Sequence, residues 1–140
     1  MMIKKMRIGD CRFYDKVITQ GDVLAYAKIT GDHNPAHYDE DYTKTTIFKK
    51  PIVHGMFVGS LFSKIFGMDY PGEGTIYCSQ SLTFLKPVYP NTRLLVKVTV
   101  KTIVPEKNRV IFTTEVFDND DVLLLTGEAM LMPRRDKAYE

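Results

Sequence analysis

A long apolar segment in the middle of the chain constrains the fold more than any other feature. It runs from Gly55 to about Met68 and is hydrophobic on most of its circumference when drawn as a helix. A helix of this kind is expected to be buried, because it has no broad polar face to present to water. The rest of the chain should therefore be arranged around it.

The second half of the chain contains the strands that would enclose this helix. Residues 93–104 and 109–117 alternate apolar and polar side chains, which is the period of a strand with one buried face. Further strands are expected at 75–85 and 122–132, and the Asp-Asn-Asp-Asp stretch at 118–121 predicts a hairpin turn. The short connections indicate antiparallel pairing. The expected fold class is α+β, with one helix wrapped by one curved antiparallel sheet.

The first part of the chain predicts a strand and two helices. A short strand is expected at 11–18. Thr19, with Asp22 three residues on, has the pattern of a helix start, and Gly31 is well placed to end that helix. The Asn-Pro pair at 34–35 then predicts the cap and first residue of a second, short helix.

The composition narrows the class of protein. A length of 140 residues predicts a single domain over 1–140, and a net charge of +2 does not favour nucleic-acid binding. No apolar run is long enough to span a membrane, and the basic N-terminus lacks the apolar core of a signal peptide. Cys11 and Cys78 are far apart, which argues against a disulfide or zinc site and suits a reducing compartment. We therefore expect a cytoplasmic protein whose free sheet edges a second copy could cover.

The loop after the first helix places a carboxylate close to an imidazole. Asp32 and His37 lie five positions apart on a turn that Gly31 and Pro35 restrict. An acid and an imidazole held together can move protons near neutral pH. The same spacing also occurs in ordinary loops. In that alternative, Asp32 ends one helix and His37 is a surface residue of the next. His33 is the competing imidazole, but its side chain should diverge from Asp32 if the segment is extended.

The start of the apolar helix has a second candidate group. The N–H of Gly55 should be free and supported by the helix dipole, as in an oxyanion hole, although a glycine there also eases entry into a packed helix. His54 by itself indicates a hydrogen-bonded structural residue more than a catalyst. Ser63 falls roughly on the same helix face as Gly55 and lacks the Gly-x-Ser-x-Gly pattern of a nucleophile. The three histidines do not have metal-site spacing, so no metal is expected.

Four motifs occur in a recognisable order along the whole chain. They are Gly-Asp-His-Asn-Pro-Ala-His at 31–37, Pro-Ile-Val-His-Gly-Met at 51–56, Ser-Gln-Ser-Leu-Thr-Phe at 79–84 and Thr-Gly-Glu-Ala at 126–129. With these motifs the chain resembles the MaoC-like (R)-specific enoyl-CoA hydratases of the hot-dog superfamily.

The resemblance implies a fold, a reaction and a set of site residues. It implies a hot-dog homodimer that converts trans-2-enoyl-CoA into (R)-3-hydroxyacyl-CoA with no cofactor other than the CoA of the substrate. Asp32 and His37 would be the catalytic pair, and Gly55 would donate its N–H to the thioester oxygen. Ser63 would orient the pair, and Asn34 would help to hold the loop.

Three other activities remain open from the sequence. A hot-dog thioesterase would hydrolyse acyl-CoA, and an acyl-carrier-protein dehydratase would act on a protein-tethered chain. A non-catalytic acyl-CoA-binding module would need neither Asp32 nor His37, so their presence argues against it. The acyl chain length and the physiological direction of the reaction do not follow from the sequence.

Overall fold

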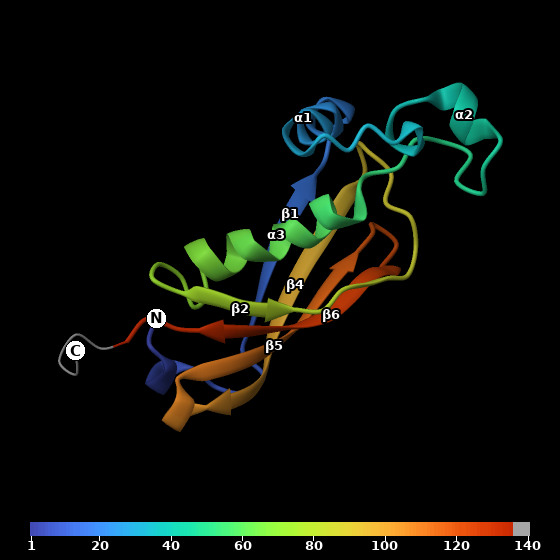
Figure 1. The fold of residues 1–140 in the computed structure, drawn as a ribbon. Coiled ribbons are helices and arrows are strands. Elements are labelled where there is room, and N and C mark those ends of the chain that lie inside the picture. The colour runs from blue at the N-terminus through green and yellow to red at the C-terminus, as the bar shows by residue number, and fades with distance from the viewer. Residues whose placement is uncertain (136–140) are drawn as a thin grey trace.

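A computed structural model describes residues 1–135 and shows one antiparallel sheet with a long helix lying across it (Figure 1). The strands are β1 (Cys11–Val17), β2 (Ile76–Gln80), β3 (Thr83–Phe84), β4 (Arg93–Val104), β5 (Arg109–Phe117) and β6 (Leu123–Met132). The α-helices are α1 (Gln20–Thr30), α2 (Glu40–Lys44) and α3 (Gly55–Met68). Three 3-10 helices complete the elements: η1 (Ile3–Lys5), η2 (Pro35–His37) and η3 (Pro105–Lys107).

The strands form one sheet in the order β1-β4-β5-β6-β2, with β3 also paired to β6, and every pair is antiparallel. The strands predicted at 93–104 and 109–117 are confirmed. The single strand predicted at 75–85 is wrong in one respect, because it is interrupted between β2 and β3. At this break the chain runs against β6 so closely that a Cβ on Gly127 would lie 1.8 Å from the Ser81 carbonyl oxygen.

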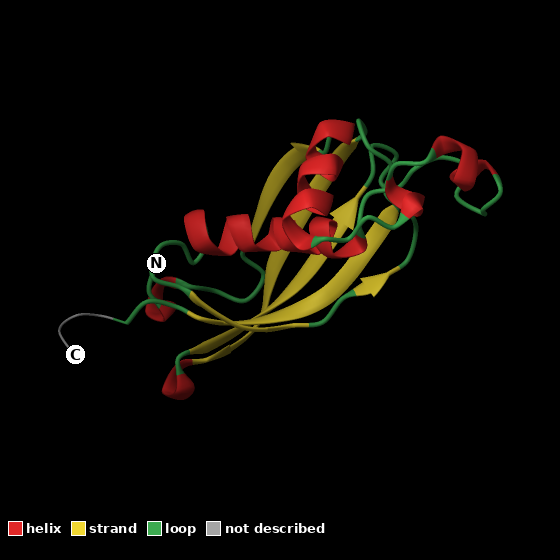
Figure 2. Cartoon of the chain, turned by 45° about the horizontal axis from the view of Figure 1, so that its top comes forward, coloured by secondary structure: helices red, strands yellow, loops and turns green. Residues whose placement is uncertain are grey.

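The core lies between α3 and the sheet (Figure 2). Alternate side chains of β4 and β5 are buried, as the predicted period requires. The burial predicted for α3 is correct for one face only, because a single sheet covers one side of a helix. The outer face is exposed and includes Met56, Ser60, Ser63 and Met68, whereas the buried residues are Val58, Gly59, Leu61, Phe62, Ile65 and Phe66.

The elements α1, η2 and α2 gather at one end of the molecule, near the N-terminus of α3 (Figure 1). The predicted start and end of α1 are confirmed: Thr19 and Asp22 form a capping box, and Gly31 ends the helix at a φ of 81°. The short helix predicted after Asn34 is η2, while α2 has its own cap at Asp39. None of the helices in residues 1–135 is long and apolar enough to cross a bilayer.

Candidate active site

Side chains and backbone groups of the loop after α1 hold it in one conformation. Asp32 Oδ1 accepts from the Asn34 N–H at 3.3 Å, and Asn34 Oδ1 accepts from the Ala36 N–H at 3.0 Å. Thr30 Oγ1 accepts from the Asp32 N–H at 3.2 Å, which joins the loop to the end of α1. Asn34 is thereby the cap of η2. These bonds leave the Asp32 side chain exposed on a loop of defined shape.

His37 lies at the end of η2 and is buried. Its Nδ1 is 2.8 Å from the backbone oxygen of Ile52. A carbonyl oxygen can only accept, so Nδ1 bears the proton and Nε2 keeps its lone pair. The Ile52 N–H donates in return to the Ala36 oxygen at 3.0 Å, and the Gln20 amide donates to the His37 oxygen at 3.1 Å. The imidazole is therefore held with Nε2 available as a proton acceptor.

Burial is the main influence on the protonation of His37. Burial lowers the pKa of the imidazole below the ordinary 6.5, and it outweighs the hydrogen bond to Ile52, which raises the pKa. The neighbouring His54 lowers the pKa further, while the Asp32 carboxylate raises it. Since the net direction is downward, the His37 imidazole is uncharged at neutral pH.

Asp32, His37 and His54 meet at one point although they come from three positions in the chain. One side-chain oxygen or nitrogen from each lies within 4.8 Å of the others. The pair Asp32 and His37, predicted from sequence, is thus close in space. His33 is exposed and donates its backbone N–H to the Gly31 oxygen at 3.1 Å. Its ring has no contact with the other two histidines in the described part of the chain.

This cluster has the composition of a metal site, but the contacts of its two imidazoles do not favour a shared ion. His37 Nδ1 and His54 Nε2 each face a carbonyl oxygen. Their rings are stacked, with centroids 3.7 Å apart and an interplanar angle of 23°. The lone pairs on the remaining nitrogens lie in nearly parallel planes, so they do not converge on one ion about 2.0–2.1 Å from each.

Gly55 is the first residue of α3 and borders an apolar pocket of about 520 Å³. Its N–H has no acceptor within the described residues and points out of the helix start, where the dipole favours negative charge. The Phe84 ring lies so close that a Cβ on residue 55 would be 2.7 Å from Cε1. Only glycine fits here without a shift of that ring. The pocket is also lined by Ile47, Ile52, Met56, Leu85, Leu124 and Leu125.

Ser63 lies elsewhere on α3. It is eight residues beyond Gly55, a rise of about 12 Å along the helix axis, and its side chain is exposed. Among residues 1–135 the Ser63 hydroxyl has no hydrogen bond to Asp32 or His37. A single chain therefore does not bring Ser63 to the pair, and the orienting role remains a prediction.

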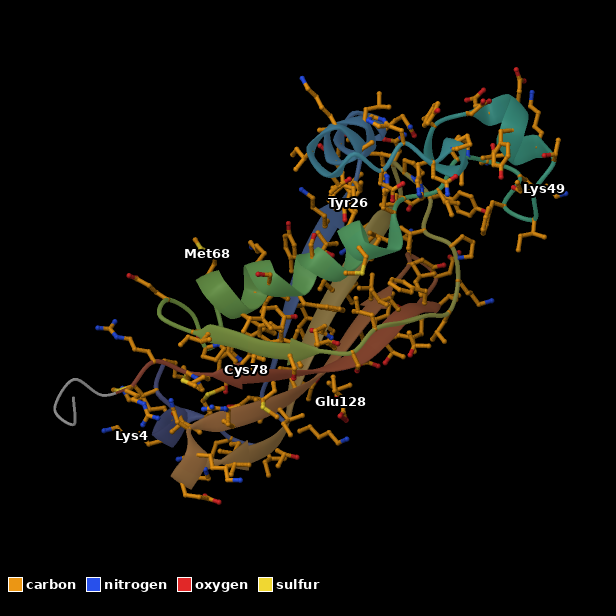
Figure 3. The ribbon with its side chains drawn as sticks, in the orientation of Figure 1. Lys4, Tyr26, Lys49, Met68, Cys78 and Glu128 are labelled. Carbon is orange, nitrogen blue, oxygen red and sulfur yellow. The ribbon has the colours of Figure 1, made fainter. Side chains whose placement is uncertain are left out.

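Two further residues at the site were not singled out as functional from sequence. The Phe84 ring lies against Gly55. Tyr26 stacks on Phe57 of α3 and contacts the His54 ring. Tyr26 extends from α1 toward the N-terminal end of α3 (Figure 3). The Ser-Gln-Ser-Leu-Thr-Phe motif contains Phe84, but nothing in its spacing shows that it meets Gly55.

The family to which these features belong follows from comparison with known proteins. Residues 9–122 match the family described as MaoC like domain. The chain belongs to the MaoC-like family. A family member from Aeromonas caviae, an (R)-specific enoyl-CoA hydratase, is 36% identical over 131 residues, or 94% of this chain and 98% of the relative. Another from Rhodospirillum rubrum with the same name is 41% identical over 117 residues, covering 84% and 81%.

Solved structures of the MaoC-like family agree with the fold. The R-hydratase of Pseudomonas aeruginosa superimposes with a TM-score of 0.90 at 36% identity, covering 96% of this chain and 86% of that one. The neighbours are hot-dog hydratases, so the hot-dog fold expected from the motifs is confirmed.

Proposed function

We propose that this chain is an (R)-specific enoyl-CoA hydratase, which adds water reversibly to trans-2-enoyl-CoA. The observation that carries the proposal is the uncharged His37 imidazole beside the Asp32 carboxylate. Residues 52–55 connect this pair to the Gly55 N–H, which borders an apolar pocket. Water activation, oxyanion binding and an apolar acyl site are the components that this reaction needs. The similar hydratases support the assignment.

The reaction can be followed through these groups. Asp32 and His37 Nε2 hold one water between them; its oxygen bonds to C3 of the enoyl thioester while the pair takes one proton. Electron density moves from the double bond to the thioester oxygen, which accepts from the Gly55 N–H. The pair then returns a proton to C2, giving the 3-hydroxyacyl thioester. Asp32 and His37 are treated as one unit, because two coupled groups share their titration.

The test is the loss of the enoyl-thioester absorbance band with crotonyl-CoA and its six- and eight-carbon homologues, followed by chiral analysis of the product. We expect the band to disappear without release of free CoA, and the product to be the (R) isomer. Release of CoA would identify a thioesterase instead. Turnover only with carrier-protein substrates would identify an acyl-carrier-protein dehydratase, and tight binding without turnover a binding module.

Two broader expectations accompany this function. The chain is proposed to act as a homodimer, because β2 is an edge strand with an exposed apolar surface that a second copy can cover. The cytoplasm is proposed as its compartment, since Cys11 and Cys78 are both free thiols. No resident cofactor is required by the steps above.

A further inference from the structure

His54 is a buried imidazole to which the proposed reaction assigns no task. It directly precedes α3 and is only 3% exposed. Its ring stacks on His37 with centroids 3.7 Å apart, and it contacts the Tyr26 ring at 4.7 Å with an angle of 53°. A polar ring stands here where an apolar side chain could pack. Buried polar atoms are usually hydrogen-bonded, so the partners of the two ring nitrogens have to be accounted for.

The two ring nitrogens of His54 differ in their surroundings. Nε2 is 3.1 Å from the backbone oxygen of Asp32. Because that oxygen can only accept, Nε2 bears a proton. Nδ1 is buried and has no partner within residues 1–135. A proton on Nδ1 would have no acceptor, so the contacts fit the tautomer that carries its proton on Nε2.

We propose that His54 is a positioning residue that aligns the acid–base pair with the oxyanion donor; this inference rests on the proposed function. Its Nε2–H holds the backbone of Asp32, and its face holds the ring of His37. Both groups belong to the segment after α1, whereas His54 is joined by one peptide bond to Gly55 at the start of α3. One side chain therefore sets the water-activating groups relative to the N–H that receives the thioester oxygen.

Two variants separate the hydrogen bond from the packing. His54→Phe keeps an aromatic ring but has no donor, whereas His54→Gln has an N–H that can reach the Asp32 oxygen. His33→Phe is the matched control, since it removes an exposed imidazole from the same loop. Misplacement of reacting groups by about 1 Å costs on the order of 100-fold in rate. We expect His54→Phe to lower kcat by about 10- to 100-fold with KM changed less than about threefold.

The two other variants should separate the hydrogen bond from the packing in their kcat values. His54→Gln should recover most of the loss in kcat, and His33→Phe should show none. Wild-type kcat in His54→Phe would overturn the proposal. Equal losses in the Phe and Gln variants, accompanied by the same fall in Tm, would also overturn it, because they would show a packing role alone.

A spectroscopic measurement on the wild-type chain tests the arrangement without turnover. Nitrogen NMR of the imidazoles at neutral pH should show His54 protonated at Nε2 and bare at Nδ1, and His37 protonated at Nδ1. A His54 ring with its proton on Nδ1 alone would contradict the proposal even if His54→Phe failed to fold. If the wild-type chain hydrates no enoyl-CoA, the proposed function fails, and the spectra still decide how His54 is bonded.

Discussion

His33, His37 and His54 have the same side chain but lie in three different environments. His33 is exposed, while His37 and His54 are buried and hydrogen-bonded to backbone oxygens through opposite ring nitrogens. The nitrogen that remains free is Nε2 in His37 and Nδ1 in His54. Of the three, His37 therefore combines a lone pair with proximity to the Asp32 carboxylate.

Removing either member of the proposed catalytic pair should abolish most of the activity. Acid–base groups contribute about 10²- to 10⁴-fold in rate, so Asp32→Asn and His37→Ala should each lower kcat for crotonyl-CoA hydration by that order. The fold should persist, because Asp32 is exposed and His37 contributes little to the apolar core. Activity assays with circular dichroism check both points. His33→Ala is the control, and a comparable loss there would show that the wrong imidazole was chosen.

The lowered pKa of His37 predicts how activity depends on pH. Because burial lowers the pKa of the His37 imidazole below the ordinary 6.5, the midpoint of the acid limb of kcat/KM for hydration should lie below pH 6.5. A pH–rate profile measures this limb. A midpoint above pH 6.5 would contradict the prediction, since it would require a raised pKa for His37.

The same lowered pKa affects stability with a defined sign. Above 6.5 His37 is neutral in the folded and unfolded states, so it adds no pH dependence. Below 6.5 the unfolded state binds a proton that the folded state does not, and the free energy of unfolding therefore falls as the pH falls. Urea unfolding at about pH 7.5 and about pH 5.5 should show a smaller decrease for His37→Gln than for the wild-type chain. An equal decrease would indicate that other groups account for it.

At the scale of elements, the start of α3 joins the loop that carries Asp32 and His37 to the apolar pocket. Its N-terminus carries the Gly55 N–H, and β3 places the Phe84 ring against it. The strand pairing of β3 with β6 fixes where that ring lies. The position of this proposed oxyanion donor consequently depends on a sheet contact as well as on the helix.

Gly55→Ala tests this contact, since alanine keeps the N–H but adds a Cβ 2.7 Å from the Phe84 ring. We expect kcat/KM to fall about 100-fold as the donor shifts. Adding Phe84→Ala should restore at least about tenfold by removing the clash. Gly67→Ala is the control on the same helix, because a Cβ there meets nothing within 4 Å; it should leave activity unchanged. No recovery in the double variant would mean that the clash is not the cause.

At the scale of the whole molecule, one sheet covers one face of α3 and leaves two sheet edges open. β1 and β2 are the terminal strands of the sheet, and β2 exposes four of its residues, Ile76–Ser79. The outer face of α3 is exposed as well. A second copy against β2 would continue the sheet and cover apolar surface, which is the physical basis of the proposed dimer.

Light scattering coupled to gel filtration checks this proposal. The wild-type chain should have the mass of a dimer, and Ile76→Lys on β2 should shift it toward the monomer, because a buried unpaired charge is costly. Ile76 is 55% exposed in the single chain, and Phe13 on the opposite edge is 53% exposed, so Phe13→Lys is a matched control that should leave the mass unchanged. A monomeric wild-type chain would refute the dimer, and a monomeric Phe13 variant would place the interface at β1.

Local patterns were sufficient for those features whose causes are local. The alternation in residues 93–117, the Thr19 and Asp22 capping box and the Gly31 helix end depend on neighbours a few positions away, and the structure confirms them. The proximity of Asp32 to His37 was also predictable, because both lie on one short restricted turn.

Only the tertiary structure decided the features that join distant segments. The break between β2 and β3, the Phe84 ring on Gly55 and the His54 contacts with Asp32 and His37 each bring together residues far apart in sequence. Hydrophobic periodicity and capping rules concern residues that are close in the sequence. They do not predict these contacts, which depend on the strand order of the sheet and on how α3 packs against it. The sequence by itself predicted most of the elements, the family and the loop that carries Asp32 and His37. Packing decided which ring nitrogen of each buried imidazole keeps its lone pair and how the two rings stack.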